Sequence, residues 1–146
     1  LVKNRTLKTL NLSDISCDGM PLVTSAGWQG FFTCLQSQGS VLEEIDLGYG
    51  SIDGQGLCAL TNALSDNSTV KTLNLSHNTQ VTNAEWRSFF DCLKRPDIAI
   101  RELCLSGNNI KDEELAHLAQ SLASNATLET LDLGPSPAKT DAGWAP

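Results

Sequence analysis

The sequence predicts an α/β solenoid in which short parallel strands line the concave face and helices cover the convex face. One apolar hexapeptide pattern recurs five times along the 146 residues, and apolar residues at helical spacing fill the intervals between its copies. Because parallel strands need a crossover connection, a strand and a helix together make one unit. Consecutive units are therefore expected to stack into a segment of a horseshoe.

The strand element is the pattern LxxLxL, whose last four positions alternate polar and apolar residues as a half-buried strand does. Its copies are LKTLNL at Leu7, LEEIDL at Leu42, VKTLNL at Val70, IRELCL at Ile100 and LETLDL at Leu128. Successive copies begin about 30 residues apart, within the range of known repeat periods, and the first interval is the longest. Each copy is predicted to be one strand of a single sheet.

The helix element occurs in two alternating types. Leucines at i, i+3 and i+7 fill residues 57–64 and recur in the same spacing over residues 115–122. The second type carries a tryptophan in the contexts TSAGW, TNAEW and TDAGW, at Trp28, Trp86 and Trp144. Both types recur with a period of about 58 residues, so the repeat is a pair of units. The tryptophans are expected in the core. Residues 1–146 are predicted to form a single domain of about five repeats, a fragment of a longer array.

Composition argues against several classes of function. The net charge of -7 and the ten scattered Lys and Arg residues oppose nucleic-acid binding, which needs a clustered basic surface. No apolar run approaches the about eighteen residues that cross a bilayer, so we expect no membrane span. Five cysteines without a CxxC pair indicate reduced thiols in the cytoplasm, with neither a zinc site nor a disulfide between Cys34 and Cys92.

No pairing of a nucleophile with a base can be recognised in the sequence. His77 and His117 also lack cysteine or carboxylate partners at the spacing of metal ligands. We therefore expect no enzymatic activity, no cofactor and no metal site.

These alternating units of about 30 residues resemble the leucine-rich repeats of the ribonuclease-inhibitor type, which also occur in NOD-like receptors and Ran GTPase-activating protein. In that family an Asn or Cys after LxxLxL bonds the backbone of the turn, a role that the resemblance gives to Asn78 and Asn108. The same position holds Ile15, Gly50 and Ser136 in the other copies, so an irregular turn ladder is expected. The first loop, SDISCDGMPLVTSAG, is longer than its counterpart one pair later and should bulge.

The motif Asn-x-Ser/Thr occurs at Asn4, Asn11, Asn67, Asn74 and Asn125. It would mark glycosylation in a secreted chain, but structural roles are the simpler interpretation. Asn67 and Asn125 follow helices where a left-handed cap is wanted, and two of the others are strand positions. Asp112, Glu113 and Glu114 are expected to open a helix and favour the positive end of its dipole.

The predicted interaction surface is the concave face of the sheet. The third and fifth residues of each LxxLxL copy point away from the core. They are Thr9, Asn11, Glu44, Asp46, Thr72, Asn74, Glu102, Cys104, Thr130 and Asp132. Strands lie about 4.8 Å apart, so these residues should align into two rows holding four acids and no Lys or Arg. Lys8, Lys71 and Arg101 at the neighbouring positions dilute this field, and an ordinary solvated face is the alternative interpretation.

The main hypothesis is a protein-protein interaction scaffold that binds a partner with a basic surface through these rows, because a surface of one sign attracts the opposite sign. The resemblance leaves two alternatives open. One is the ligand-sensing repeat arm of a NOD-like nucleotide-dependent receptor, and the other is a GTPase-activating regulator. The sequence indicates no particular oligomeric state.

Overall fold

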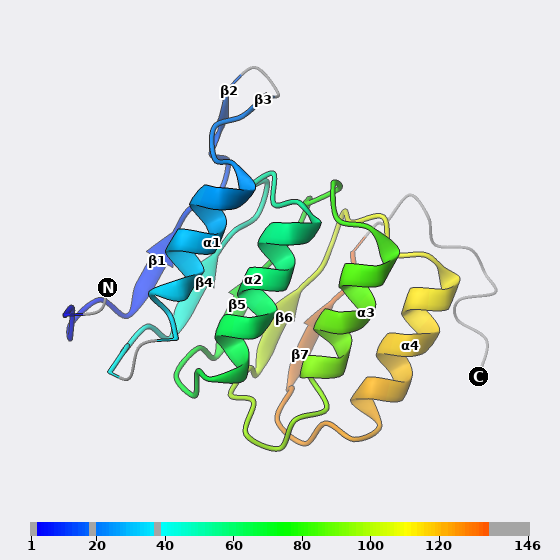
Figure 1. The fold of residues 1–146 in the computed structure, drawn as a ribbon. Coiled ribbons are helices and arrows are strands. Elements are labelled where there is room, and N and C mark those ends of the chain that lie inside the picture. Colours follow the sequence, from blue (N-terminus) through cyan, green and yellow to red (C-terminus); the bar gives the residue numbers. More distant parts are fainter. Residues whose placement is uncertain (1–2, 18–19, 37–38, 135–146) are drawn as a thin grey trace.

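The main sheet has five parallel strands within the part of the chain that the structure describes. The computed structural model describes residues 3–17, 20–36 and 39–134. The strands lie in the order β1-β4-β5-β6-β7, so each strand pairs with the one from the next unit (Figure 1). Their bounds are β1 (Thr9–Asn11), β4 (Glu44–Asp46), β5 (Thr72–Asn74), β6 (Glu102–Cys104) and β7 (Thr130–Asp132). Every strand predicted from LxxLxL is confirmed.

Within the described residues, four helices form a second layer on one side of the sheet (Figure 1). They are α1 (Ser25–Thr33), α2 (Gly54–Ser65), α3 (Asn83–Cys92) and α4 (Asp112–Leu122). Each helix packs against the next one along the chain, just as each strand pairs with the next. The predicted solenoid, with the sheet on its concave face and helices on its convex face, is confirmed.

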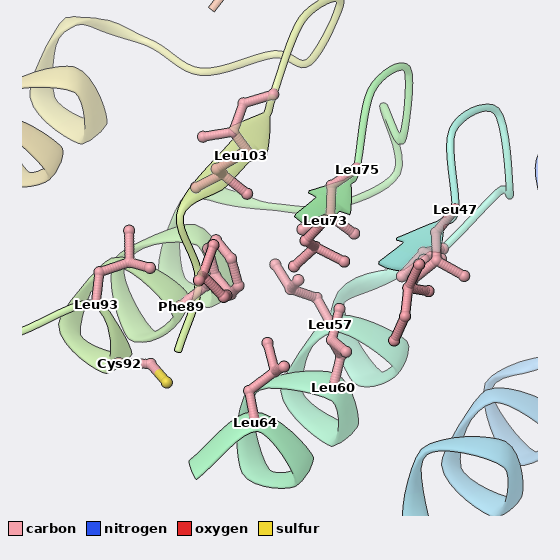
Figure 2. Packing of buried hydrophobic residues seen from close by; sticks show 14 of the residues in the cluster. Leu47, Leu57, Leu60, Leu64, Leu73, Leu75, Phe89, Cys92, Leu93 and Leu103 are labelled. Atoms are coloured by element: carbon pink, nitrogen blue, oxygen red, sulfur yellow. The ribbon is translucent and has the colours of Figure 1, made fainter. Parts of the chain in front are cut away.

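The core lies between the two layers. The middle residues of the three central strands, Ile45, Leu73 and Leu103, are at most 2% exposed. In Figure 2 the labelled strand leucines approach helix residues such as Leu57 and Phe89 across the interlayer space. Removal of this apolar surface from water is the main contribution to the stability of each unit. One apolar face per strand and one per helix are therefore buried against each other.

The tryptophan helices pack their aromatic residues into this core, as predicted. Trp28 is 2% exposed and Trp86 is fully buried. Trp28 stacks on Phe32 with 5.4 Å between ring centroids, and Trp86 stacks on Phe90 at 5.8 Å. The same stack therefore occurs in two described units that are one pair apart, which agrees with the paired repeat. Trp144 lies outside the described residues.

The two asparagines after the strand pattern bond the turn backbone, as the resemblance implies. Asn108 accepts the N–H of Asn78 at 2.8 Å and donates to the carbonyl oxygens of Leu75 and Leu105, both at 2.9 Å. Gly50 has no such side chain, and its own N–H bonds the carbonyl of Leu47 at 3.2 Å. The ladder is irregular at this turn for that reason. Ser136 lies outside the described residues.

The left-handed cap expected at Asn67 and Asn125 is wrong, because the described non-glycine residues with positive φ do not include them. The Asn67 side chain instead accepts the N–H groups of Thr69 and Val70, both at 2.9 Å, and donates to the carbonyl of Leu35 at 3.3 Å. Asn125 repeats this arrangement, donating to the carbonyl of Leu93 at 2.7 Å. Both asparagines therefore order the turns that lead into strands, a structural role that differs from the expected cap.

The long first loop forms a small β-hairpin from β2 (Ser16–Cys17) and β3 (Met20–Pro21). The hairpin projects from the edge of the solenoid above α1, which confirms the expected bulge (Figure 1). The sequence did not predict strands in it.

Cys34 caps α1 and Cys92 ends α3, with α2 packed between these helices, an arrangement that agrees with the exclusion of a disulfide between the two cysteines. The thiol of Cys92 is reduced and lies 3.9 Å from the hydroxyl of Ser65. Burial raises the pKa of this thiol.

Candidate interaction surface

The two rows predicted on the concave face are present. Strand pairing places residues of successive units directly opposite each other, and each row follows this register. The Thr/Glu row consists of Thr9, Glu44, Thr72, Glu102 and Thr130, and the Asn/Asp row consists of Asn11, Asp46, Asn74, Cys104 and Asp132. All ten side chains lie on the face opposite to the core leucines, so the predicted residues form one continuous surface.

The Thr/Glu row is open to solvent. Glu44 and Glu102 are exposed and are separated by one strand, that of Thr72. Glu44 accepts a hydrogen bond of 3.3 Å from the hydroxyl of Thr9. Two carboxylates about 10 Å apart, twice the strand spacing, therefore face outward from this row.

The Asn/Asp row has a structural role that the sequence reasoning missed. A side-chain oxygen of four of its members accepts the backbone N–H two residues further on, at 2.7 to 2.9 Å. These members are Asn11, Asp46, Asn74 and Asp132. Asp46 also accepts from the amide of Asn74 at 2.8 Å. Each such bond closes the turn after a strand, and it fixes the carboxylates of Asp46 and Asp132 in place.

Cys104 departs from that pattern. Its thiol donates to the carboxylate of Asp132 at 3.5 Å and lies 3.3 Å from the hydroxyl of Ser106. The thiol therefore lies within the polar row, next to the carboxylate of Asp132.

The cations that we expected to dilute the acidic field are paired with other acids. Lys8 and Lys71 lie 3.1 and 2.9 Å from the carboxylate of Glu43, and Arg101 pairs with Glu129. Hydrogen bonds from Lys71 and then Lys8 lower the pKa of Glu43. These five residues form a row of their own in which two acids offset two of the three cations, so the field of the two concave rows is diluted less than three unpaired cations would dilute it.

An aromatic pair lies at the rim of the concave face, beyond the carboxyl ends of the strands. The rings of Tyr49 and His77 stack with 4.1 Å between centroids and an interplanar angle of 9°. Tyr49 is 54% exposed. The sequence reasoning missed this pair, although both residues take the same position in consecutive units, two residues after the strand pattern ends.

An ion pair on the convex face joins a buried carboxylate to a half-exposed arginine of the preceding helix. Glu114 is fully buried, and one of its carboxylate oxygens lies 3.0 Å from Nη2 of Arg87 on the preceding helix. Arg87 also contacts the exposed Glu113 at 2.7 Å. Asp112, Glu113 and Glu114 do lie in the first turn of α4, as predicted, but Glu114 has this second role.

The described part of the chain has neither a metal-binding cluster nor a membrane-spanning helix. It contains no group of three or more His, Cys, Asp or Glu residues arranged to hold a metal ion. None of its helices is long and apolar enough to cross a membrane.

Comparison with known proteins agrees with this architecture. A family described as Leucine Rich repeat matches residues 3–14 and 66–84. A solved structure titled leiomodin-1 actin-binding site 2 superimposes with a TM-score of 0.76, covering 90% of this chain and 73% of that chain at 20% identity. The chain folds as a leucine-rich-repeat domain. The tropomodulin C-terminal domain of Caenorhabditis elegans gives a TM-score of 0.72 over 95% of this repeat domain and 79% of its own chain, at 14% identity.

These likenesses concern the fold. A search of curated protein sequences finds no match. At 14% and 20% identity the two solved structures share the arrangement of strands and helices with this repeat domain. The resemblance to the ribonuclease-inhibitor type in particular stays a prediction.

Proposed function

We propose that this leucine-rich-repeat domain is a protein-interaction scaffold that binds the basic surface of a partner protein through the Thr/Glu and Asn/Asp rows. The observation that carries the proposal is the alignment of Glu44, Asp46, Glu102 and Asp132 on one face, while the nearest cations are paired with Glu43 and Glu129. Such a surface attracts a basic partner and speeds its association.

The geometry of the rows supports this proposal. The carboxylates of Asp46 and Asp132 are held by the N–H groups of Gly48 and Gly134 at 2.9 and 2.7 Å. Fixed carboxylates lose less conformational entropy on binding than mobile ones do. The exposed Glu44 and Glu102 add adaptable contacts beside them.

The fold supports the class of function as well. A parallel sheet on the inside of a solenoid gives an extended surface of aligned side chains, which suits the recognition of another macromolecule. The leiomodin structure of the same fold is named as an actin-binding site. The two alternatives, a receptor sensing arm and a GTPase-activating regulator, stay predictions.

The test uses three forms of the chain as bait: the wild type, a row variant and a convex control. The row variant carries E44Q, D46N, E102Q and D132N, and the control carries D66N, D91N, D97N and E113Q on exposed acids of the helical side and its loops. Four neutralised acids change the net charge from -7 to -3 in both variants. Any difference between them therefore reports where the charges lie.

Proteins cross-linked by the wild type and the control, but not by the row variant, are purified and titrated against all three forms. Purified actin is titrated first, because of the name of the leiomodin structure. We expect the row variant to bind a partner about ten- to a hundredfold more weakly, since each exposed charge contributes up to about 1 kcal/mol. Equal losses of affinity in the row variant and the convex control would show that only net charge matters. Unchanged binding by the row variant would exclude the rows as the site.

A further inference from the structure

A row of left-handed residues runs along the rim of the sheet, one per unit. Asp14, Tyr49, His77 and Gly107 have φ values of 56°, 52°, 55° and 69°. The N–H groups of the first three donate to a carbonyl oxygen of the next unit, each at 2.9 Å. The row is therefore in register, and Asp14 precedes Tyr49 by one unit as Tyr49 precedes His77.

Two of these positions carry aromatic rings on a backbone that favours glycine. The ring of His77 lies over Gly107, so close that an added Cβ on this glycine would overlap the ring. Tyr49 stacks on His77 with the rings 9° from parallel. His77 therefore covers one face of the Tyr49 ring, and the other face is directed toward the unit of Asp14.

The surroundings of that second face are acidic. Asp14 is exposed one unit away along the row. Asp46 is held at the end of the strand below Tyr49, because its carboxylate accepts the N–H of Gly48 at 2.9 Å. The cations Lys8, Lys71 and Arg101 precede the strands and are paired with Glu43 and Glu129, at the opposite end of the sheet.

An exposed aromatic face beside carboxylates fits one side chain best. A guanidinium is planar, stacks on an aromatic ring and still donates hydrogen bonds within its own plane, whereas the lysine ammonium is a hydrated point charge.

We propose that Tyr49 and Asp14 form an arginine clamp, in which an arginine of the basic partner stacks on the open face of Tyr49 and donates to the carboxylate of Asp14. This inference rests on the proposed function, because the arginine belongs to the partner that the acidic rows attract. It adds a rule of specificity: the partner presents arginine, and not only positive charge, at the rim.

The experiment uses the single tyrosine of the chain as a reporter. Tyrosine labelled with carbon-13 in its ring gives NMR signals from Tyr49 alone, and the chain is titrated with the capped tripeptides Gly-Arg-Gly and Gly-Lys-Gly. We expect the arginine peptide to shift the Tyr49 signals saturably and to bind about two- to fivefold more tightly than the lysine peptide, because only a guanidinium can stack flat on the ring and donate to the Asp14 carboxylate at the same time. Equal shifts with both peptides, or none with either, would overturn the clamp.

Two variants separate the clamp from a loss of folding and from the rows. Asparagine tolerates a left-handed φ as aspartate does, so the variant D14N should keep the fold while it loses the carboxylate. We expect D14N to remove the preference for the arginine peptide, and an unchanged preference would overturn the role of Asp14. The variant E102Q, two strands away from Asp46, should leave the Tyr49 response intact, and a loss there would overturn the local clamp.

The clamp and the proposed function can fail separately. If no partner depends on the rows but the arginine peptide shifts the Tyr49 signals specifically, the clamp is supported and the concave rows are excluded as a binding site. If a partner depends on the rows but the Tyr49 signals do not respond to arginine, the proposed function is supported and the clamp is excluded.

Discussion

The side-chain amide of Asn78 donates to the carbonyl oxygen of Leu47, which belongs to the preceding unit and lies 3.0 Å away. Through this bond the turn after β5 adds a second donor to a carbonyl that already accepts the N–H of Gly50 at 3.2 Å. The oxygen of the same carboxamide accepts the N–H of Ile52 at 2.8 Å. One asparagine therefore supplies hydrogen bonds for two consecutive turns.

Substitution of Asn78 by alanine should destabilise the domain strongly. The residue is 1% exposed, so its loss leaves the N–H of Ile52 and the carbonyl of Leu47 buried without these bonds. We expect the free energy of unfolding to fall by about 2 to 4 kcal/mol in urea titrations. The neighbouring N109A is the matched control, because Asn109 is exposed and makes a single bond of 3.3 Å, and it should change stability by less than about 0.5 kcal/mol. Similar results for the two variants would contradict the role assigned to Asn78.

The sequence alone predicted the sheet and the concave rows residue by residue, because both follow from one strongly periodic pattern. Once LxxLxL fixes a strand, the alternation of its side chains decides which residues face out, and stacking decides which of them align. Glu44 and Glu102 were assigned to one row on this basis, and the register confirms it.

What the sequence did not predict depends on contacts that the pattern does not encode. Tyr49 and His77 lie in the loops of two different units, where hydrophobic periodicity carries no signal. If the turn positions of successive units had been aligned as the strand positions were, the alignment would have shown aromatic residues at the same turn position in two consecutive units. The burial of Glu114 was missed for a different reason: an acid in the first turn of a helix usually faces solvent, and only the position of Arg87 on α3 makes a buried carboxylate tolerable.

That ion pair gives an ordered prediction for three variants. In R87Q the buried Glu114 carboxylate loses its cation, whereas in E114Q the remaining arginine is half-exposed and can be hydrated. We therefore expect R87Q to lower the urea midpoint more than E114Q, and the double variant to be more stable than R87Q alone. The control E113Q removes an exposed carboxylate and should have little effect. Equal urea midpoints for R87Q and E113Q would show that the ion pair between Arg87 and Glu114 does not stabilise the domain.

The row of paired charges before the strands makes stability depend on pH. Because Lys71 and Lys8 lower the pKa of Glu43 from its ordinary value of 4.5, the folded state binds this proton less readily than the unfolded state does. The stabilisation from Glu43 is present above pH 4.5 and is lost as the pH falls through the lowered pKa. We expect K71M to reduce the urea midpoint at pH 7 and the difference from wild type to shrink as the pH falls through the lowered pKa.

The order of the two lysines provides the check on that prediction. Lys71 contributes more to the lowered pKa of Glu43 than Lys8 does, so K8M should give a smaller loss at pH 7 with the same pH dependence. A difference between wild type and K71M that stayed constant from pH 7 to pH 3 would show that Lys71 stabilises the domain through packing and not through Glu43.

The last prediction concerns Gly107, which provides the space that the His77 ring occupies. An alanine there would place its Cβ against that ring on a backbone with φ of +69°, so the ring must move and the backbone is strained. We expect G107A to lower the free energy of unfolding by about 1 to 3 kcal/mol and to weaken the nuclear Overhauser contacts between the rings of His77 and Tyr49. The control G30A lies in α1 with no atom near the added methyl group, and it should stabilise the domain by about 0.5 to 1 kcal/mol because alanine favours a helix. Intact ring contacts in G107A would mean that the stack is held by the turns of Tyr49 and His77 themselves, and that the glycine of the next unit is not needed to place it.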